Sequence, residues 1–223
     1  MTDAEVLARI LDARHSCRAF LSDPLPREVI EEIVTEAQKV ASWCNAQPWQ
    51  LVVTGAEETG RLRAALAEEM KTASHTPDIP FPERYSGVYK DRRSICGWQL
   101  YGAVGVEKGD REGSHRQMME NFRFFGAPHV AVLTSEAELG PYGLVDCGGF
   151  LTALTLAATA RGVATIPQAA LASYAPFLHR FFNLSENRTI VCVISMGRED
   201  DSHPANRFRT SRAALNETLR WQG

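Results

Sequence analysis

The stretch Ala41-Ser42-Trp43-Cys44-Asn45-Ala46-Gln47-Pro48-Trp49 leads directly into the apolar, strand-like segment Leu51-Val52-Val53. Apolar residues at helical spacing from Arg27 to Val40 precede it, so the stretch connects a helix to a strand. Ser42 and Asn45 carry short polar side chains of the kind that satisfy free backbone groups at a helix end, or a ligand. The stretch therefore predicts a polar hinge between two regular elements.

Pro48 favours an extended conformation at Gln47, which directs the chain from the hinge into a sheet. Taken alone, the hinge fits an ordinary connection with one buried tryptophan. A second stretch, Arg14-His15-Ser16-Cys17-Arg18-Ala19-Phe20, changes this balance. Its two arginines and the serine hydroxyl between them could converge on a phosphate. The alternative is a solvated basic helix end, which the helix dipole favours.

Together the two stretches resemble the FMN-dependent nitroreductase family, which carries Arg-x-Ser-x-Arg/Lys-x-Phe followed by Pro-Ser-x-x-Asn-x-Gln-Pro-Trp. The chain matches both patterns, at the family's spacing, except at Ala41, where the family usually has proline. The resemblance covers nearly the whole chain. It implies an α+β fold, a nitroreductase-like three-layer sandwich with a mainly antiparallel central sheet flanked by helices, which forms an intertwined homodimer.

Length and composition indicate one domain spanning residues 1–223. Hydrophobic residues make up 44% of the chain and charged residues 23%, as expected for a globular protein with a sizeable core. The net charge of -3 argues against a protein that coats nucleic acid or an anionic membrane. Any anion site must therefore be a local cluster of basic residues.

The five cysteines are scattered, which argues against a disulfide framework and against a metal site. Cys17 and Cys44 are expected to be buried packing residues, because no histidine is placed by local spacing to activate them. The N-terminal residues 1–5 lack the features of a secretory signal, so a cytoplasmic location is expected.

The segment Leu144–Val163 is long and apolar enough to span a membrane. Its threonines, the Gly148-Gly149 pair and the charges near each end fit a helix buried by neighbouring helices better. We interpret it as the central core helix, with close backbone approach at the two glycines, and we expect no membrane partner.

Other segments follow ordinary patterns. Helices are expected at 3–13, 57–73, 113–125 and 174–182, and strands at 50–54, 129–134 and 189–197. The pattern loosens over 74–113, where basic and aromatic residues alternate; relatives use this region to cover the flavin, so it is the candidate lid. Nucleic-acid binding by the same residues is a weaker alternative. Residues 198–223 are expected to form a C-terminal arm that wraps a partner subunit.

The resemblance also implies which residues contact FMN. Arg14 and Ser16 correspond to residues near the phosphate and ribityl chain, Arg18 to one near the pyrimidine edge, and the tail arginines to phosphate ligands. The full set is Arg14, His15, Ser16, Arg18, Ser42, Trp43, Cys44, Asn45, Gln47, Asn121, Arg123, Pro167, Gln168, Ala169, Ala170, Arg209 and Arg212. Glu120 competes with Asn121 and Arg123, and simple packing at a helix end is an equal alternative for those two. An ordinary loop is the alternative for 167–170.

The resemblance implies an NAD(P)H-dependent oxidoreductase in which hydride passes through flavin N5 to nitroaromatics or quinones by a ping-pong mechanism. FMN is the implied cofactor, NADH or NADPH the co-substrate, and no side chain is expected to be catalytic. Two alternatives stay open. One is a reductive dehalogenase or flavin-fragmenting relative on the same fold, and the other is a flavin-binding module without turnover.

Overall fold

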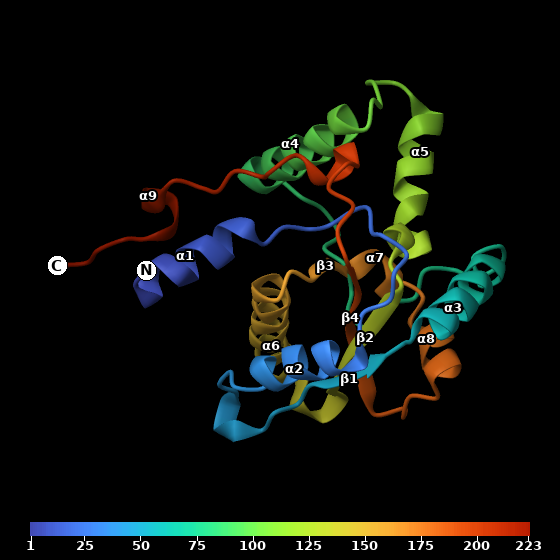
Figure 1. Cartoon of the computed structure of the whole chain (residues 1–223), viewed down its shortest axis with the longest axis horizontal. Helices are drawn as coiled ribbons and strands as arrows, with labels where there is room; N and C mark the ends of the chain where they lie inside the picture. Colours follow the sequence, from blue (N-terminus) through green and yellow to red (C-terminus); the bar gives the residue numbers. More distant parts are fainter.

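The computed structural model describes all 223 residues, Met1–Gly223. Four strands form a single antiparallel sheet in the order β1-β2-β4-β3 (Figure 1). Their bounds are β1 Gln50–Val53, β2 His129–Glu136, β3 Ala164–Gln168 and β4 Arg188–Gly197. Every predicted strand is present within a few residues of its expected limits. The α+β class with an antiparallel sheet is therefore confirmed.

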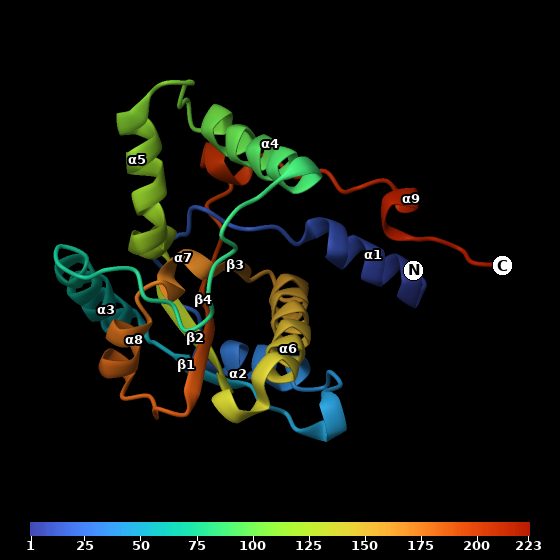
Figure 2. The same cartoon turned by 180° about the vertical axis from the view of Figure 1, so that it is seen from behind.

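Helices pack on both faces of the sheet (Figures 1 and 2). One face carries α2 (Arg27–Ala37) and α6 (Gly140–Ala160), and the other carries α3 (Ala56–Glu69), α7 (Ala169–Ala172) and α8 (Ala175–Phe182). Alternate residues of β2 and β4 supply both cores because side chains along a strand point to opposite faces. Val130 and Val132 join one core, and Ala131 and Leu133 join the other.

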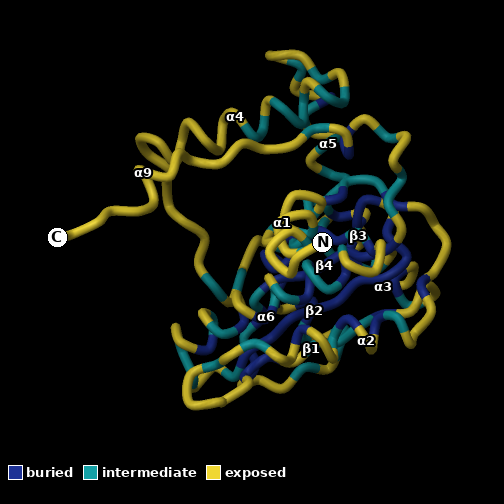
Figure 3. The backbone as a smooth tube through the Cα atoms, turned by 60° about the vertical axis from the view of Figure 1, so that its left-hand side comes forward, coloured by how far each residue is buried: buried dark blue, intermediate teal, exposed yellow.

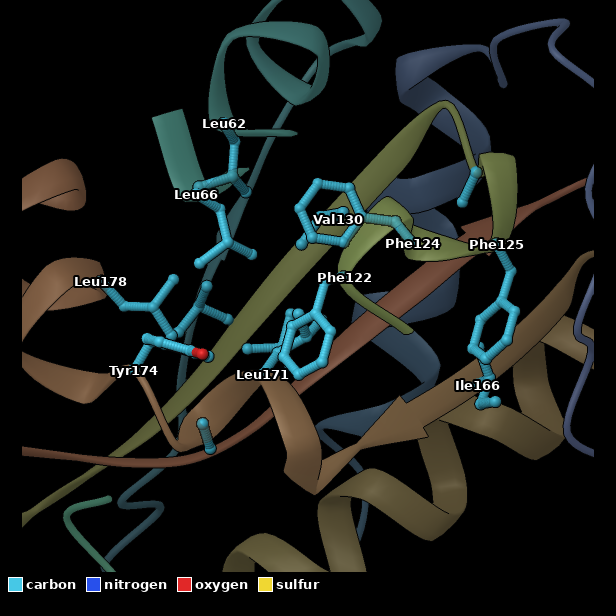
Figure 4. Packing of buried hydrophobic residues seen from close by; sticks show 14 of the residues in the cluster. Leu62, Leu66, Phe122, Phe124, Phe125, Val130, Ile166, Leu171, Tyr174 and Leu178 are labelled. Atoms are coloured by element: carbon cyan, nitrogen blue, oxygen red, sulfur yellow. The ribbon is translucent and has the colours of Figure 1, made fainter. Parts of the chain in front are cut away.

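The core beneath α3 and α8 is rich in aromatic side chains (Figure 4). Phe122 and Phe124 come from the 3-10 segment η2 (Glu120–Gly126), and they pack with Leu62 and Leu66 of α3. Full burial of such a side chain contributes about 1.5–3 kcal/mol. This packing fixes the segment that precedes β2.

The helix α6 passes a length and composition test for a membrane span over Ala137–Ala160. Its buried face, which includes Phe150 and Leu154, packs against the sheet and α2, as predicted for a core helix. The expected close approach at Gly148 and Gly149 is wrong within this chain, because a Cβ atom at either position meets nothing within 4 Å. The opposite face of α6 is exposed.

Three helices contribute no buried residue, namely α1 (Asp3–Ala13), α4 (Gly87–Ala103) and α9 (Leu215–Thr218). They extend from the body of the chain, and Figure 3 shows the end of the C-terminal arm, residues 209–223, in the yellow of exposed residues. The sequence pattern predicts no regular helix where α4 lies. With no buried stripe, the apolar residues of α4 lack the helical spacing on which such a prediction depends.

The predicted helix 113–125 proves to be two elements. The helix α5 covers Arg111–Met119, and η2 follows with Phe124 and Phe125 at φ 59° and 52°. A positive φ is unfavourable for a bulky residue, and at these two positions it breaks the helical path within η2. Further 3-10 turns are η1 (Trp43–Asn45), η3 (Ala137–Leu139) and η4 (Pro204–Asn206).

Candidate functional site

After α1 the chain runs beside β3. Ser16 pairs with Thr165 in a parallel bridge, and the Cys17 N–H donates to the Thr165 carbonyl at 3.1 Å. Cys17 is fully buried, and burial raises the pKa of its thiol to about 12. Because side chains alternate along an extended segment, Ser16 and Arg18 point away from the core, to the same side. This arrangement makes Cys17 a packing residue, as predicted.

The C-terminal arm meets this segment and closes a cavity of about 570 Å³. Six of the predicted cofactor residues line it, four of them arginines from the two ends of the chain. The lining is Leu11, Asp12, Arg14, His15, Ser16, Arg18, Cys96, Phe208, Arg209, Thr210 and Arg212. The structure therefore brings together Arg14, His15, Ser16, Arg18, Arg209 and Arg212, and we call this space the arginine cavity.

The arginine cavity has an excess of unpaired positive charge. None of its four arginines has a carboxylate within ion-pair distance, although Asp12 also lines the cavity. Eight other arginines of the chain are so paired, namely Arg27, Arg61, Arg92, Arg116, Arg123, Arg161, Arg180 and Arg188. Burial lowers the pKa of Arg14, and the nearby charge of Arg212 lowers it further. An anion placed between these two groups offsets both the burial of the Arg14 charge and its repulsion by Arg212.

Arg18 is the most enclosed of the four arginines, and burial lowers its pKa. Its guanidinium donates to the Ser16 carbonyl at 3.1 Å and lies 5.6 Å from the centre of the Phe208 ring. Such a cation–π contact stabilises an arginine without removing its charge. Arg18 thus presents a fixed positive charge to the cavity.

His15 forms part of the wall of the arginine cavity. Its Nδ1 lies 3.0 Å from the Ala13 carbonyl, and its Nε2 lies 2.9 Å from a carboxylate oxygen of Glu199. Both ring nitrogens are therefore engaged within the protein. In this arrangement the ring supports the segment that carries Arg14 and Ser16.

The hinge has a strained backbone. Cys44, Asn45 and Gln47 have φ values of 50°, 57° and 48°, so the expected extended conformation at Gln47 is wrong. The Gln47 N–H donates to Ser42 Oγ at 3.0 Å, and the Trp43 N–H donates to the Asp146 carboxylate of α6 at 3.1 Å. The first contact closes a turn within the hinge, and the second attaches the hinge to α6. Strain of this kind concentrates at functional sites.

Side chains of the hinge face solvent in the single chain. Trp43 is 62% exposed, and Cys44 is exposed as well, so its predicted burial is wrong. Trp49 is the buried tryptophan, stacked on Phe150. None of the five predicted hinge residues, Ser42, Trp43, Cys44, Asn45 and Gln47, lines the arginine cavity of its own chain.

The end of β3 is held by a buried side chain. Gln168 Nε2 donates to the Asn121 carbonyl at 2.9 Å, and its Oε1 accepts a hydrogen bond from Ser195. Ala169 follows, exposed, at the start of α7. Gln168 is thus a structural anchor, and the predicted contacts at Pro167, Ala169 and Ala170 depend on the backbone that it holds.

Asn121 and Arg123 do not line the arginine cavity. Asn121 Nδ2 donates to the Met118 carbonyl, while Arg123 pairs with Glu120 at 2.8 Å and lines a separate groove beside Arg63. Glu120, the competing candidate, lines a second cavity of about 500 Å³ that also contains Arg18. The geometry thus favours Glu120 over Arg123 as a neighbour of Arg18.

Several residues in or beside the arginine cavity were not predicted from the sequence. Cys96 belongs to α4, which the sequence pattern does not reveal. Phe208 lies under Arg18, and the neighbouring Asn206 is buried although it sits in a polar tail. The only available signal for Phe208 is its place between two arginines.

Comparison with known proteins places these features in one family. The nitroreductase family profile matches residues 11–198. Nitroreductase NfnB of Mycolicibacterium smegmatis is 34% identical over 219 residues, covering 98% of this chain and 93% of the relative. A 4-nitrobenzoate reductase of Pseudomonas putida is 33% identical, with coverage of 91% and 89%.

The fold is similar to a solved structure over its full length. The crystal structure of the FMN-dependent nitroreductase NfnB from Mycobacterium smegmatis in complex with NADPH superposes with a TM-score of 0.93 and 33% identity. The match covers 99% of each chain. With the family profile and the curated relatives, this shows that the chain belongs to the nitroreductase family.

Proposed function

We propose that this chain is an FMN-dependent nitroreductase that oxidises NADPH or NADH and reduces nitroaromatic compounds. The observation that carries the proposal is the arginine cavity, where Arg14, Arg18, Arg209 and Arg212 converge without carboxylate partners. The relatives named above support the same reaction, because one is an FMN-dependent enzyme crystallised with NADPH and another a 4-nitrobenzoate reductase. Quinones are further acceptors that we propose.

The residues of the arginine cavity fit FMN. A phosphate dianion matches the cationic pair Arg14 and Arg212, whose charges otherwise oppose each other. Ser16 adds a hydroxyl on the same side of the segment as Arg18. FMN supplies the hydride chemistry when bound, by accepting a hydride from a nicotinamide and passing it to an acceptor.

The chain's own residues bind and orient rather than transfer protons. Arg18 supplies a fixed positive charge, which favours an electron-rich ring beside it. Gln168, held by Ser195 and Asn121, fixes the backbone from which Ala169 and Ala170 can donate N–H groups. Because these donors are backbone groups, we propose no catalytic side chain. We also propose ping-pong kinetics, because the nicotinamide and the acceptor are both flat and would use the same open face of the flavin in turn.

We propose that the functional unit is an intertwined homodimer. The chain exposes 13610 Å², whereas a compact monomer of this mass exposes about 10,000 Å². Exposed apolar residues on α1, α6 and the arm support the same conclusion, including Leu7, Val145 and Trp221. In the dimer the hinge of one subunit completes the arginine cavity of the other, which explains why one chain keeps them apart.

Further features of the chain have a place in this proposal. The whole chain acts as one domain, the segment 74–113 with α4 forms the lid, and residues 198–223 form the arm that contacts the partner. The exposed aromatic residues Tyr85, Tyr89 and Trp98 support the lid assignment. A cytoplasmic location is supported by five free cysteines, and cell fractionation tests it.

The test is anaerobic titration of the purified protein reconstituted with FMN. We expect NADPH or NADH to bleach the flavin absorbance and a nitroaromatic such as 4-nitrobenzoate to restore it. A yellow protein that neither nicotinamide bleaches would support a binding module instead. Restoration by an iodinated phenol but not by a nitroaromatic would favour a dehalogenase.

A further inference from the structure

Asn206 is a buried polar residue at the junction of the two ends of the chain. It lies in η4, is 3% exposed, and is surrounded by main-chain groups of the N-terminal segment and the arm. Its Oδ1 accepts a hydrogen bond from the Arg18 N–H at 2.7 Å. Its Nδ2 donates to the carbonyls of Ala19 and Asp200, each at 2.9 Å.

These three bonds suit asparagine and no other side chain of similar size. The carboxamide offers an acceptor on one side and two donors on the other, and each is used here. Aspartate lacks the donors, and alanine lacks all three groups. Loss of the side chain leaves the Arg18 N–H, which has no other partner in the chain, without its acceptor.

The same residue also contacts the second basic group. The main-chain carbonyl of Asn206 accepts a hydrogen bond from Arg209 Nη1 at 2.7 Å. The Arg18 guanidinium lies over the ring of Phe208, two residues after Asn206. Asn206 therefore links the backbone of Arg18 to the turn from which Arg209 enters the arginine cavity.

We propose that Asn206 is a positioning residue for FMN, which sets the spacing between the N-terminal and C-terminal arginines that hold the phosphate. It does not line the arginine cavity. Its side chain holds the main chain of the segment that carries Arg14, and its carbonyl holds the Arg209 side chain. The inference rests on the proposed function. It goes further in assigning phosphate selectivity to a buried amide outside the cavity.

The test compares FMN with riboflavin, which lacks the phosphate. Dissociation constants for both are measured by flavin fluorescence in wild type and Asn206→Ala. We expect affinity for FMN to fall about tenfold and affinity for riboflavin to fall less than about threefold. A residue that merely stabilised the fold would weaken both ligands by the same factor.

Thr59→Val is the matched control. Thr59 of α3 is also buried, away from both cavities, and its hydroxyl bonds the Thr54 hydroxyl and the Gly55 carbonyl. This variant should leave the ratio of the two constants unchanged. Asn206→Ala should also have a smaller effect on the ratio in an Arg209→Ala background, because one of the arginines that it positions is then gone.

The inference would be overturned if Asn206→Ala bound both flavins with wild-type dissociation constants, or lost the same factor of affinity for both. If that variant does not fold, Asn206→Ser, which keeps one hydrogen-bonding group, is measured by the same ratio and judged by the same outcomes. A wild-type protein that binds neither flavin would instead contradict the proposed function itself. The two failures are therefore distinguishable.

Discussion

Arg14 and Arg212 line one cavity although the first follows the N-terminal helix and the second lies in the C-terminal arm. Burial lowers the pKa of Arg14, and the charge of Arg212 lowers it further. Two like charges held together are unfavourable unless an anion joins them. This relationship is the physical basis for the phosphate site and for the first prediction.

Removing either of these arginines should weaken FMN binding. We expect Arg14→Ala and Arg212→Ala each to raise the dissociation constant about tenfold, since a hydrogen bond to a charged group contributes about 1.5–3 kcal/mol. Fluorescence titration measures this. Arg207→Ala is the control, because Arg207 is exposed and bonds only the Ser202 carbonyl. Unchanged binding in both variants would remove the phosphate assignment.

The buried thiol of Cys17 should make stability depend on pH in the alkaline range. Burial raises its pKa from 9.0 to about 12, so the unfolded chain loses the proton first as pH rises. The stability is fully present below pH 9 and is lost as pH approaches 12. Urea midpoints at pH about 8 and about 10.5 should therefore differ less in Cys17→Ala than in wild type.

Cys44→Ala is the control for that experiment. Cys44 is exposed, so its replacement should leave the pH dependence as in wild type. Cys192, whose pKa burial also raises to about 12, is present in all three proteins and does not affect the comparison. Identical pH dependence in Cys17→Ala and wild type contradicts this account of Cys17.

Arg188 should be important for the stability of the fold, because it joins the end of the hinge at Pro48 to the sheet. Its guanidinium is buried, pairs with Glu136 at 2.7 Å, and donates to the carbonyls of Thr134 at 2.8 Å and Pro48 at 3.1 Å. Arg188→Ala leaves these acceptors unpaired and should cost about 3 kcal/mol of unfolding free energy. Urea denaturation measures it, and a loss below about 1 kcal/mol would count against the prediction.

The exposed face of α6 offers a test of the proposed homodimer. Gly148 and Gly149 have open space around them, so alanine should fit each in a lone chain and stabilise the helix by about 1 kcal/mol. If a second copy covers this face, the added methyl groups should instead weaken association. Light scattering over a dilution series measures the effect. A monomeric wild type, with both variants more stable, would contradict the homodimer.

The sheet and its central helices could be predicted from the sequence because their side chains are buried in regular patterns. The apolar run of β4 and the long apolar segment of α6 are examples, although the expected approach at Gly148 was wrong. The proximity of Arg14 and Arg212 was expected from the family resemblance together with two basic clusters at the chain ends. Their shared cavity is visible only in three dimensions.

Other features could not be read from residue types. The helix α4 buries no residue, so it leaves no periodic pattern. Positive φ values at Phe124, Phe125 and Gln47 oppose local preference and arise from tertiary packing and hydrogen bonding. Asn206 looks like any polar tail residue until its three buried bonds are seen.

The central claim is that basic residues from both ends of the chain form one phosphate site for FMN. The most direct measurement is the pair of dissociation constants of the wild-type protein for FMN and riboflavin. We predict that FMN binds at least about a hundredfold more tightly, as two charged hydrogen bonds to a phosphate imply. Equal affinity for the two flavins, or no binding of either, would contradict the account.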